Sequence, residues 1–314
     1  MTAAVYRKYG PPEVLKIEDV PRPALKKGYI LVKSCGSSVN QLDNRVRRGV
    51  LWIVTGPFTP MKKIPGSDVS GEVAACGKGV TRFKIGDGVY AVAGIIGGGG
   101  FAEYVLVPEK QAAKRPRNIP CEEAAAVPLT AQAALQALRD LGHIRRSTSI
   151  LINGASGGVG TMAIQIAKFI GAKVTAVGPA DSLDLMRSLG AARVIDYETE
   201  DFTADKNAYD IIFDVVTSSF WKCRGSLKRG GIYIASNPSP SLVLAMAGTL
   251  LGRKKAKLLA TSPSGKDLGF ITVLIESGAL RPVIDRKYPL AQAAEAYRHS
   301  ESGNTLGKIV VTIP

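Results

Sequence analysis

The feature that most constrains this chain is a glycine-dense turn between an apolar run and a helical repeat. The run Ile150-Leu151-Ile152-Asn153 is followed by Gly154, Ala155, Ser156, Gly157, Gly158, Val159 and Gly160. Apolar residues then recur at the spacing of one helix face, at Val159, Met162, Ala163, Ile166 and Ala167. The first N–H groups of such a helix lack intrahelical partners and lie at the positive end of its dipole, so they can bind a phosphate. The spacing Ala155-x-Gly157-x-x-Gly160 is a dinucleotide-binding fingerprint with alanine as its first residue, and a turn without a ligand is the alternative.

Strands and helices alternate after this turn. Residues 172–177, 192–196, 209–216 and 231–236 are predicted strands, and residues 183–189, closed by Gly190, are a predicted helix. This alternation predicts an α/β fold with a doubly wound parallel sheet.

The end of the second predicted strand bears on the choice of cofactor. An Asp or Glu there binds the adenosine ribose of NAD, but this chain has Gly178. NADPH is therefore favoured and NADH stays open, because Asp181 would repel a 2′-phosphate and no Lys or Arg follows at once. Ser182 and Tyr197 could supply neutral hydrogen bonds, with Lys173 and Arg193 nearby in the sequence, and a helix N-cap is the alternative role of Ser182.

Composition sets the broad class. A chain of 314 residues can hold two domains, and residues 1–9 show no signal-peptide core. The longest apolar run, 242–251, is about half the length of a spanning helix, so we expect a soluble, cytoplasmic protein. The four cysteines are dispersed, which predicts unpaired thiols in a reducing compartment and no metal site.

The net charge of +15 is high. Part of it clusters at 45–48, 62–63, 145–146 and 253–257, far apart in the chain and without interleaved aromatic residues. We interpret these clusters as solvated surface charge, and no nucleic-acid partner is expected. Monomer and homodimer are both compatible with the sequence.

The flanking segments differ in kind from the middle of the chain. Residues 1–120 are rich in Gly and Pro and contain short alternating strands, such as 29–34, 69–73 and 101–107, which predict an irregular β-rich domain. The tail returns to amphipathic helices from about Ser264 and closes with a predicted strand at 308–313.

Several short motifs follow one another along nearly the whole chain. They are Val39-Asn40-Gln41-Leu42-Asp43, the segment 65–71, the segment 83–89, Glu123-Ala124-Ala125-Ala126-Val127-Pro128, the glycine turn, 189–191, 194–197, and Gly307-Lys308-Ile309-Val310. With them the chain resembles the zinc-free medium-chain dehydrogenases/reductases of the quinone oxidoreductase type, chloroplast-envelope homologues included.

The resemblance implies a GroES-like catalytic domain at 1–120, a Rossmann domain that binds NAD(P) at 121–263, and a C-terminal return to the catalytic domain at 264–314. It also implies that zinc is absent, since Asn40 and Ser67 stand where zinc alcohol dehydrogenases carry a cysteine and a histidine ligand. The implied activity is hydride transfer from NADPH to a quinone or an α,β-unsaturated carbonyl, which needs no Lewis acid.

The resemblance further implies roles for individual residues. Asn40 lies beside the nicotinamide ribose, residues 154–160 hold the pyrophosphate, and Lys308 approaches the cofactor. Val215, Val216 and Thr217 edge the cofactor crevice, and the loop of Ser236 and Asn237 faces the nicotinamide. Arg45 is the expected substrate contact, with Gln41 a further candidate and Trp52 and Phe58 as apolar walls. Ordinary packing is the alternative for the two aromatic residues.

One departure from the family pattern concerns nicotinamide binding. The family threonine after the Ala-Ala-x-Pro motif is replaced by Ala133, and a hydroxyl occurs three residues earlier, at Thr130. Either Thr130 and Gln132 take over the contact or nicotinamide binds more weakly.

Two other classes of function remain open. Residues 242–251 with the basic flank 253–257 could lie on an anionic membrane as a peripheral adaptor, with RNA as another partner of such an adaptor. An enoyl reductase acting on a carrier-bound substrate would instead use the basic clusters to dock an acidic carrier.

Overall fold

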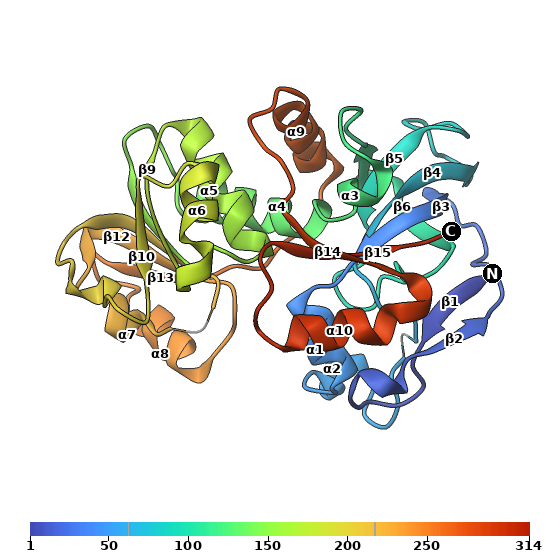
Figure 1. Cartoon of the computed structure of the whole chain (residues 1–314), viewed down its shortest axis with the longest axis horizontal. Helices are drawn as coiled ribbons and strands as arrows, with labels where there is room; N and C mark the ends of the chain where they lie inside the picture. Colours follow the sequence, from blue (N-terminus) through green and yellow to red (C-terminus); the bar gives the residue numbers. More distant parts are fainter. Residues whose placement is uncertain (62, 217) are drawn as a thin grey trace. The chain divides into compact units, whose positions relative to one another are not determined.

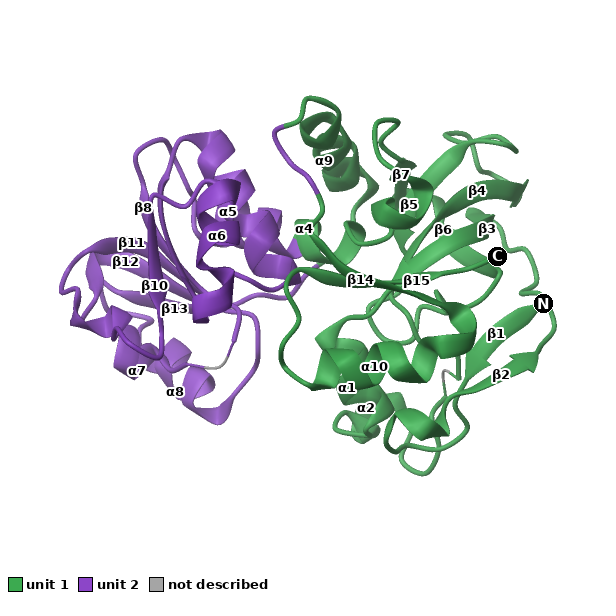
Figure 2. Ribbon diagram, viewed as in Figure 1, with its two compact units in different colours: residues 1–132, 262–278, 282–314 green, residues 133–261, 279–281 purple. Residues whose placement is uncertain are grey.

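Two units make up the structure, and each has its own sheet. The computed structural model describes residues 1–61, 63–216 and 218–314. The first unit comprises Met1–Gln132, Ser262–Gly278 and Pro282–Pro314, and the second comprises Ala133–Thr261 and Ala279–Arg281 (Figure 2). Figure 1 follows the elements along the chain.

The second unit is built on a six-stranded sheet in which every neighbouring pair is parallel. Its strands are β8 (Ser149–Asn153), β9 (Lys173–Gly178), β10 (Arg193–Asp196), β11 (Tyr209–Asp214), β12 (Leu227–Ala235) and β13 (Lys255–Leu258). The spatial order β10-β9-β8-β11-β12-β13 confirms the predicted doubly wound sheet. The order reverses between β8 and β11, and ligands of such sheets bind beyond the carboxyl ends of the strands at this point.

Helices cover this sheet. They are α5 (Gly158–Ile170), α6 (Leu183–Leu189), α7 (Phe220–Cys223) and α8 (Pro240–Gly248), and a π-helical turn spans Ala137–Leu141. The apolar stripe Met162, Ala163, Ile166 and Ala167 of α5 is buried, as its spacing predicts, and α5 packs on β8 and β9. α6 contacts β10, α7 contacts β12, and α8 contacts β13 (Figure 1).

The first unit has a seven-stranded sheet that is mostly antiparallel. Its strands are β3 (Tyr29–Ser38), β4 (Asp68–Cys76), β5 (Gly88–Val92), β6 (Tyr104–Pro108), β7 (Ala112–Lys114), β14 (Ile284–Pro289) and β15 (Lys308–Thr312), and β1 (Thr2–Val5) pairs with β2 (Lys16–Asp19) separately. The tail strand β15 lies between β14 and β3, with Val310 opposite Ser38. This register brings the start of β15 beside the end of β3.

The helices of the first unit include α1 (Gln41–Arg47), α2 (Trp52–Thr55), α3 (Cys121–Ala124), α9 (Gly265–Glu276) and α10 (Ala293–Glu301), and α4 (Pro128–Gln136) begins in it. α9 packs on β7, and α10 packs on β14 and β15 (Figure 1). No helix in the three described ranges combines the length and the hydropathy that a bilayer crossing requires.

Two sequence predictions are wrong in this fold. Cys35 and Cys121, 86 positions apart, form a disulfide because α3 packs against β3; Cys76 and Cys223 are free. The inference of a reducing compartment from unpaired thiols therefore loses its basis.

The second error concerns Arg47, whose place in the basic cluster 45–48 predicts a solvated charge. Its side chain is fully buried, donates to Gly10 O and to Glu301, and lies 5.2 Å from the Tyr297 ring centre. Tertiary contacts with α10 thus override the local charge pattern.

Candidate active site

The glycine turn after β8 has three positions of different character. Gly154 has a φ of +81°, and a Cβ there would lie 2.8 Å from Val216 Cγ1. A Cβ at Gly160 would lie 2.3 Å from Gly154 O, so this glycine lets α5 pack directly on the turn. At Gly157, by contrast, the nearest atom to a Cβ outside its chain neighbours is Gly154 O at 3.8 Å. The space over Gly157 is therefore open, and it adjoins the amino end of α5, where a phosphate fits.

Four of the predicted crevice residues meet at the carboxyl edge of the sheet. Ser236 Oγ donates to Val215 O at 2.9 Å, and Asn237 Nδ2 donates to Val215 O and Val216 O at 3.2 and 3.1 Å. The remaining residue of the predicted crevice edge, Thr217, lies outside the described residues.

A buried polar cluster lies under this edge, and the sequence analysis missed it. Asp214 accepts from Asn153 Nδ2 at 2.9 Å, from Ser218 N at 2.8 Å and from Tyr233 Oη at 2.5 Å. Burial raises the pKa of the Asp214 carboxyl. The cluster joins the ends of β8, β11 and β12. The signal that could have revealed it is that β8 and β11 both end in a polar residue, Asn153 and Asp214.

The end of β9 is tightly packed. A Cβ at Gly178 would lie 2.7 Å from Ser182 Oγ and 3.1 Å from Met186 Cε, so a carboxylate cannot be accommodated there without rearrangement. Ser182 is fully buried, and its hydroxyl donates to Pro179 O at 2.7 Å but accepts no capping hydrogen bond from an N–H of α6. Tyr197 is exposed, and its N–H donates to Gly178 O at 3.3 Å.

The basic residues near this position in the sequence are not near it in space. Lys173 begins β9 and pairs in register with Ser149, at the amino edge of the sheet. Arg193 begins β10 and forms ion pairs with Glu200 and Asp205. The end of β9 is thus left with exposed Asp181 and Tyr197.

In the first unit, Lys308 and Asn40 form the centre of a buried network. Lys308 Nζ donates to Asn40 Oδ1 at 2.8 Å and to Val39 O at 2.6 Å. The other end of the amide, Asn40 Nδ2, donates to Asp68 Oδ2 at 2.8 Å. The amide of Asn40 is therefore oriented by a cation at its oxygen and a carboxylate at its nitrogen.

Asp68 is fully buried and well compensated. Its Oδ2 also accepts from Ser38 Oγ at 2.6 Å, and its Oδ1 accepts from Leu129 N at 2.7 Å. Lys308 Nζ lies 3.9 Å from Asp68 Oδ2. Burial lowers the pKa of the Lys308 ammonium, against the attraction of Asp68 and Asp43.

Asp43 is the second buried carboxylate. It forms a capping box with Asn40 at the start of α1, accepting from Asn40 N at 3.1 Å, and its Oδ1 accepts from Ser67 Oγ at 3.1 Å. Burial, followed by the charge of Asp68, raises the pKa of Asp43 to about 6. Asp43 and Asp68 lie in the motifs that carried the resemblance, yet sequence reasoning gave neither a function; the Asn-x-x-Asp capping pattern was the available signal.

Thr130 and Gln132, the two residues that could replace the family threonine, form hydrogen bonds within the first unit. Thr130 Oγ1 donates to Ala126 O at 2.9 Å and is buried. Gln132 Nε2 donates to Pro128 O at 2.9 Å, and its Oε1 accepts from Ser264 N at 2.6 Å. Both side chains are therefore already engaged in hydrogen bonds within the first unit.

The candidate substrate contacts lie on or just after α1 and α2. Arg45 is half-buried, and among the described residues no carboxylate pairs with it. Gln41 accepts from Asn44 Nδ2 at 3.2 Å and donates to Ser300 O at 3.4 Å. Trp52 and Phe58 are exposed, Phe58 by 91%, so neither is a core residue.

Metal ligands are not assembled around Asn40 and Ser67. Both side chains bind the carboxylates of this network instead, and no group of three His, Cys, Asp or Glu side chains in the described ranges has metal-site geometry.

Comparison with known proteins gives matching family models for both parts of the chain. Residues 26–117 match the alcohol dehydrogenase GroES-like domain, and residues 189–311 match the zinc-binding dehydrogenase model. The chain is 35% identical over 326 residues to a chloroplast envelope quinone oxidoreductase homolog of Arabidopsis thaliana, covering 99% of this chain and 98% of that protein. It is 34% identical over 322 residues to an NADPH-dependent alkenal/one oxidoreductase of the same plant, covering 99% and 79%.

Solved structures agree. The quinone oxidoreductase from Coxiella burnetii superposes with a TM-score of 0.89 at 28% identity, over 100% of this chain and 99% of that one. The Escherichia coli quinone oxidoreductase complexed with NADPH superposes with a TM-score of 0.83 at 25% identity, over 99% and 100%. The chain is therefore an oxidoreductase that belongs to the quinone oxidoreductase group of the medium-chain dehydrogenase/reductase family.

Proposed function

We propose that this protein uses NADPH to reduce a quinone or an α,β-unsaturated carbonyl and needs no zinc. The observation that carries the proposal is the glycine turn, where open space over Gly157 adjoins the free N–H groups of α5. The printed names of the relatives, quinone oxidoreductase and alkenal/one oxidoreductase, suggest the two substrate classes.

Each unit contributes residues to the proposed chemistry. In the second unit, residues 154–160 would hold the pyrophosphate, and Val215, Val216, Ser236 and Asn237 would border the cofactor. Tyr197 is the exposed hydrogen-bonding group at the end of β9, whereas Ser182 would first have to give up its bond to Pro179. In the first unit, Asn40 and Lys308 would serve the nicotinamide end, and Arg45 would contact a substrate oxygen.

NADPH, when bound, supplies the hydride. The chain's own contribution is electrostatic and positional: Lys308 keeps a positive charge in a buried site, and the network with Asp68 holds the Asn40 amide in one orientation. Arg45 offers a cation that no described carboxylate neutralises, suited to the oxygen on which negative charge develops.

The test is a panel of quinones and enals, including a carrier-bound enoyl thioester, assayed with NADPH and with NADH. We expect NADPH oxidation with at least one quinone or enal, unchanged after exhaustive chelation. Activity confined to the carrier-bound substrate would favour the enoyl reductase alternative. Stoichiometric zinc in the untagged protein, or no turnover of any quinone or enal, would refute the proposal.

A specific observation favours a second role, attachment to an anionic membrane surface. Leu242 and Ala245 are the two buried residues of α8. Val243 and Leu244 on α8, and Leu250 and Leu251 in the loop after it, have exposed fractions of 62–103%. Beside them lies a cavity of about 820 Å³ lined by Trp221, Arg224, Arg229, Arg253 and Lys254, among others. Leucines beside cations and a tryptophan match the chemistry of an acidic lipid surface.

Sedimentation with vesicles tests this role. Wild type should pellet with phosphatidylserine-containing vesicles at low salt and be released at high salt, and a Leu250→Ser, Leu251→Ser variant should pellet less. Ile85→Ser, an exposed apolar residue of the first unit, is the matched control. Equal pelleting with neutral vesicles, or no effect of the leucine changes, would exclude the surface as a docking site.

A further inference from the structure

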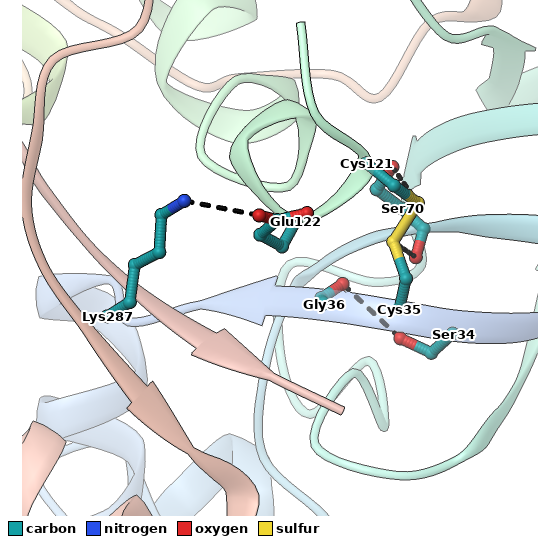
Figure 3. Close-up of a disulfide and its surroundings, with 7 residues drawn as sticks. All are labelled: Ser34, Cys35, Gly36, Ser70, Cys121, Glu122 and Lys287. Carbon is teal, nitrogen blue, oxygen red and sulfur yellow. Dashed lines mark hydrogen bonds and ion pairs between the residues drawn. A yellow bond between two sulfur atoms is a disulfide. The ribbon is translucent and has the colours of Figure 1, made fainter. Parts of the chain in front are cut away.

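The disulfide between Cys35 and Cys121 joins two segments of the first unit that both lead to Asp68. Cys35 lies in β3, Cys121 is the first residue of α3, and their Cα atoms are 6.3 Å apart (Figure 3). Both residues are half-buried rather than fully enclosed.

Each segment supplies a donor to the Asp68 carboxylate. Three residues beyond Cys35, Ser38 Oγ donates to Asp68 Oδ2 at 2.6 Å. Eight residues beyond Cys121, Leu129 N donates to Asp68 Oδ1 at 2.7 Å. The disulfide therefore fixes the distance between two chain segments that hold one buried carboxylate.

Besides the packing of α3 on β3, β4 and β15, its polar restraints are weak. It is a four-residue helix whose N-cap, Pro120, makes no side-chain cap hydrogen bond. Lys287 pairs with Glu122 at 3.2 Å (Figure 3) and also with Glu123 at 2.8 Å. These groups are solvent-accessible, and such pairs contribute little to stability. The covalent bond is thus the strongest tie between α3 and the sheet.

The same site also has partners ready for the reduced state. Cys35 Sγ lies 3.3 Å from Ser70 O, and Cys121 Sγ lies 3.6 Å from Ser70 Oγ (Figure 3). After reduction, the Cys35 thiol can donate to the Ser70 carbonyl, and the Cys121 thiol can bond the Ser70 hydroxyl. Reduction must move the two sulfurs apart to a non-bonded distance, and Ser70 then offers each thiol a polar partner.

We propose that Cys35 and Cys121 form a reversible dithiol–disulfide site whose state controls how firmly the segment from α3 to Leu129 holds Asp68. A dithiol reductant is the reaction partner. Its thiolate attacks one sulfur to give a mixed disulfide, and its second thiol then releases the enzyme thiol. Two electrons and two protons reach Cys35 and Cys121, and the reductant leaves as a disulfide.

The consequence for catalysis rests on the proposed function. Asp68 accepts from Asn40, so a loosened Leu129 contact relaxes the residue assigned to the nicotinamide end. Oxidised protein should bind NADPH more tightly, and reduction should raise the KM for NADPH roughly threefold or more with a smaller change in kcat.

The experiment begins with thiol counting on the full chain, by alkylation in denaturant followed by mass spectrometry, because Cys223 is buried in the folded protein. After mild oxidation, two alkylated cysteines are expected, Cys76 and Cys223, and after dithiothreitol under native conditions two more. Thermal unfolding and the KM for NADPH are then followed across a series of dithiothreitol redox buffers.

Matched variants separate this site from other thiol effects. Wild type and Cys76→Ser should both lose about 5 °C or more in Tm on reduction and should recover it on reoxidation. The double variant Cys35→Ser, Cys121→Ser should behave like reduced wild type in every buffer. Cys76 is a suitable control because it is also half-buried but unpaired.

Three results would overturn the proposal: four alkylated cysteines after oxidation, a disulfide that resists reduction until the protein unfolds, or a reduction that changes neither Tm nor KM. If no NADPH oxidation occurs in any redox state, the proposed function fails, while the thiol count and Tm still decide whether the site exists.

Discussion

Lys308 Nζ lies 2.8 Å from Asn40 Oδ1, which joins residues 268 positions apart in the sequence. The contact places the Lys308 cation near two carboxylates, Asp43 and Asp68. Removing the cation therefore leaves two buried carboxylates with hydrogen-bond donors but without an opposite charge, which is costly in a buried site.

Lys308→Met should destabilise the protein by about 3 kcal/mol near pH 8 and by less near pH 5. The difference arises because protonation of a carboxyl relieves the uncompensated charge at the lower pH. Urea unfolding at the two pH values measures it. An equal loss at both would show that Lys308 acts by packing alone.

Asp43→Asn should gain stability relative to wild type as pH rises from 5 to 7.5. The pKa of Asp43 is raised from its usual value of 3.8 to about 6, so the folded state holds a proton that the unfolded chain has lost. This contribution is fully present below about pH 4 and is lost as pH rises through 6. The whole shift corresponds to about 3 kcal/mol, of which about half is lost between pH 5 and 7.5. The amide variant lacks the titration, and a pH-independent difference between the two proteins in urea unfolding would contradict the assignment.

Arg47→Leu should lower the free energy of unfolding by about 3 kcal/mol, because Glu301 loses a fully buried partner and Gly10 O loses its donor. Arg48 pairs with the same carboxylate but is 56% exposed. Arg48→Ala is therefore the control and should cost under about 1 kcal/mol. Similar losses in both variants would mean that burial of Arg47 does not matter.

Gly157→Val should abolish NADPH binding while the protein stays folded, since a side chain there enters open space that the pyrophosphate would need. Gly160→Val should instead unfold or strongly destabilise the second unit, because its Cβ would overlap Gly154 O. Fluorescence titration with NADPH and circular dichroism distinguish the two effects. Wild-type affinity in the Gly157 variant would remove the glycine turn as the binding site.

Asp181→Lys should widen the preference for NADPH over NADH by roughly three- to tenfold at low salt. The exposed carboxylate repels the 2′-phosphate by about 1 kcal/mol or less, and reversal of the charge turns this into attraction. The effect should shrink as salt rises. Asp184→Lys, three residues further on, is the control, and an equal change there would show a general field effect. Better use of NADH than of NADPH by wild type at low ionic strength would contradict the predicted cofactor choice.

The sequence alone determined the second unit in outline. The turn at 154–160, the stripe of α5 and the strands β9 to β12 follow from short-range spacing, because side-chain periodicity decides which face of an element is buried. Replacement of metal-ligand residues by Asn40 and Ser67 was also readable, since it depends on residue identity at a motif position. The individual cofactor contacts stay predictions.

Only the tertiary structure decided which distant residues share a site. Lys308 meets Asn40 because β15 pairs with β3, Cys121 meets Cys35 because α3 packs on that strand, and Arg47 is buried because α10 covers α1. Each of these pairs is separated by tens to hundreds of residues, so no local pattern encodes it. Packing also decides the chemistry of these side chains. Burial and the charge of Asp68 raise the pKa of Asp43, and the nearness of Cys121 allows Cys35 to form a disulfide. Neither property follows from a residue's position in the sequence.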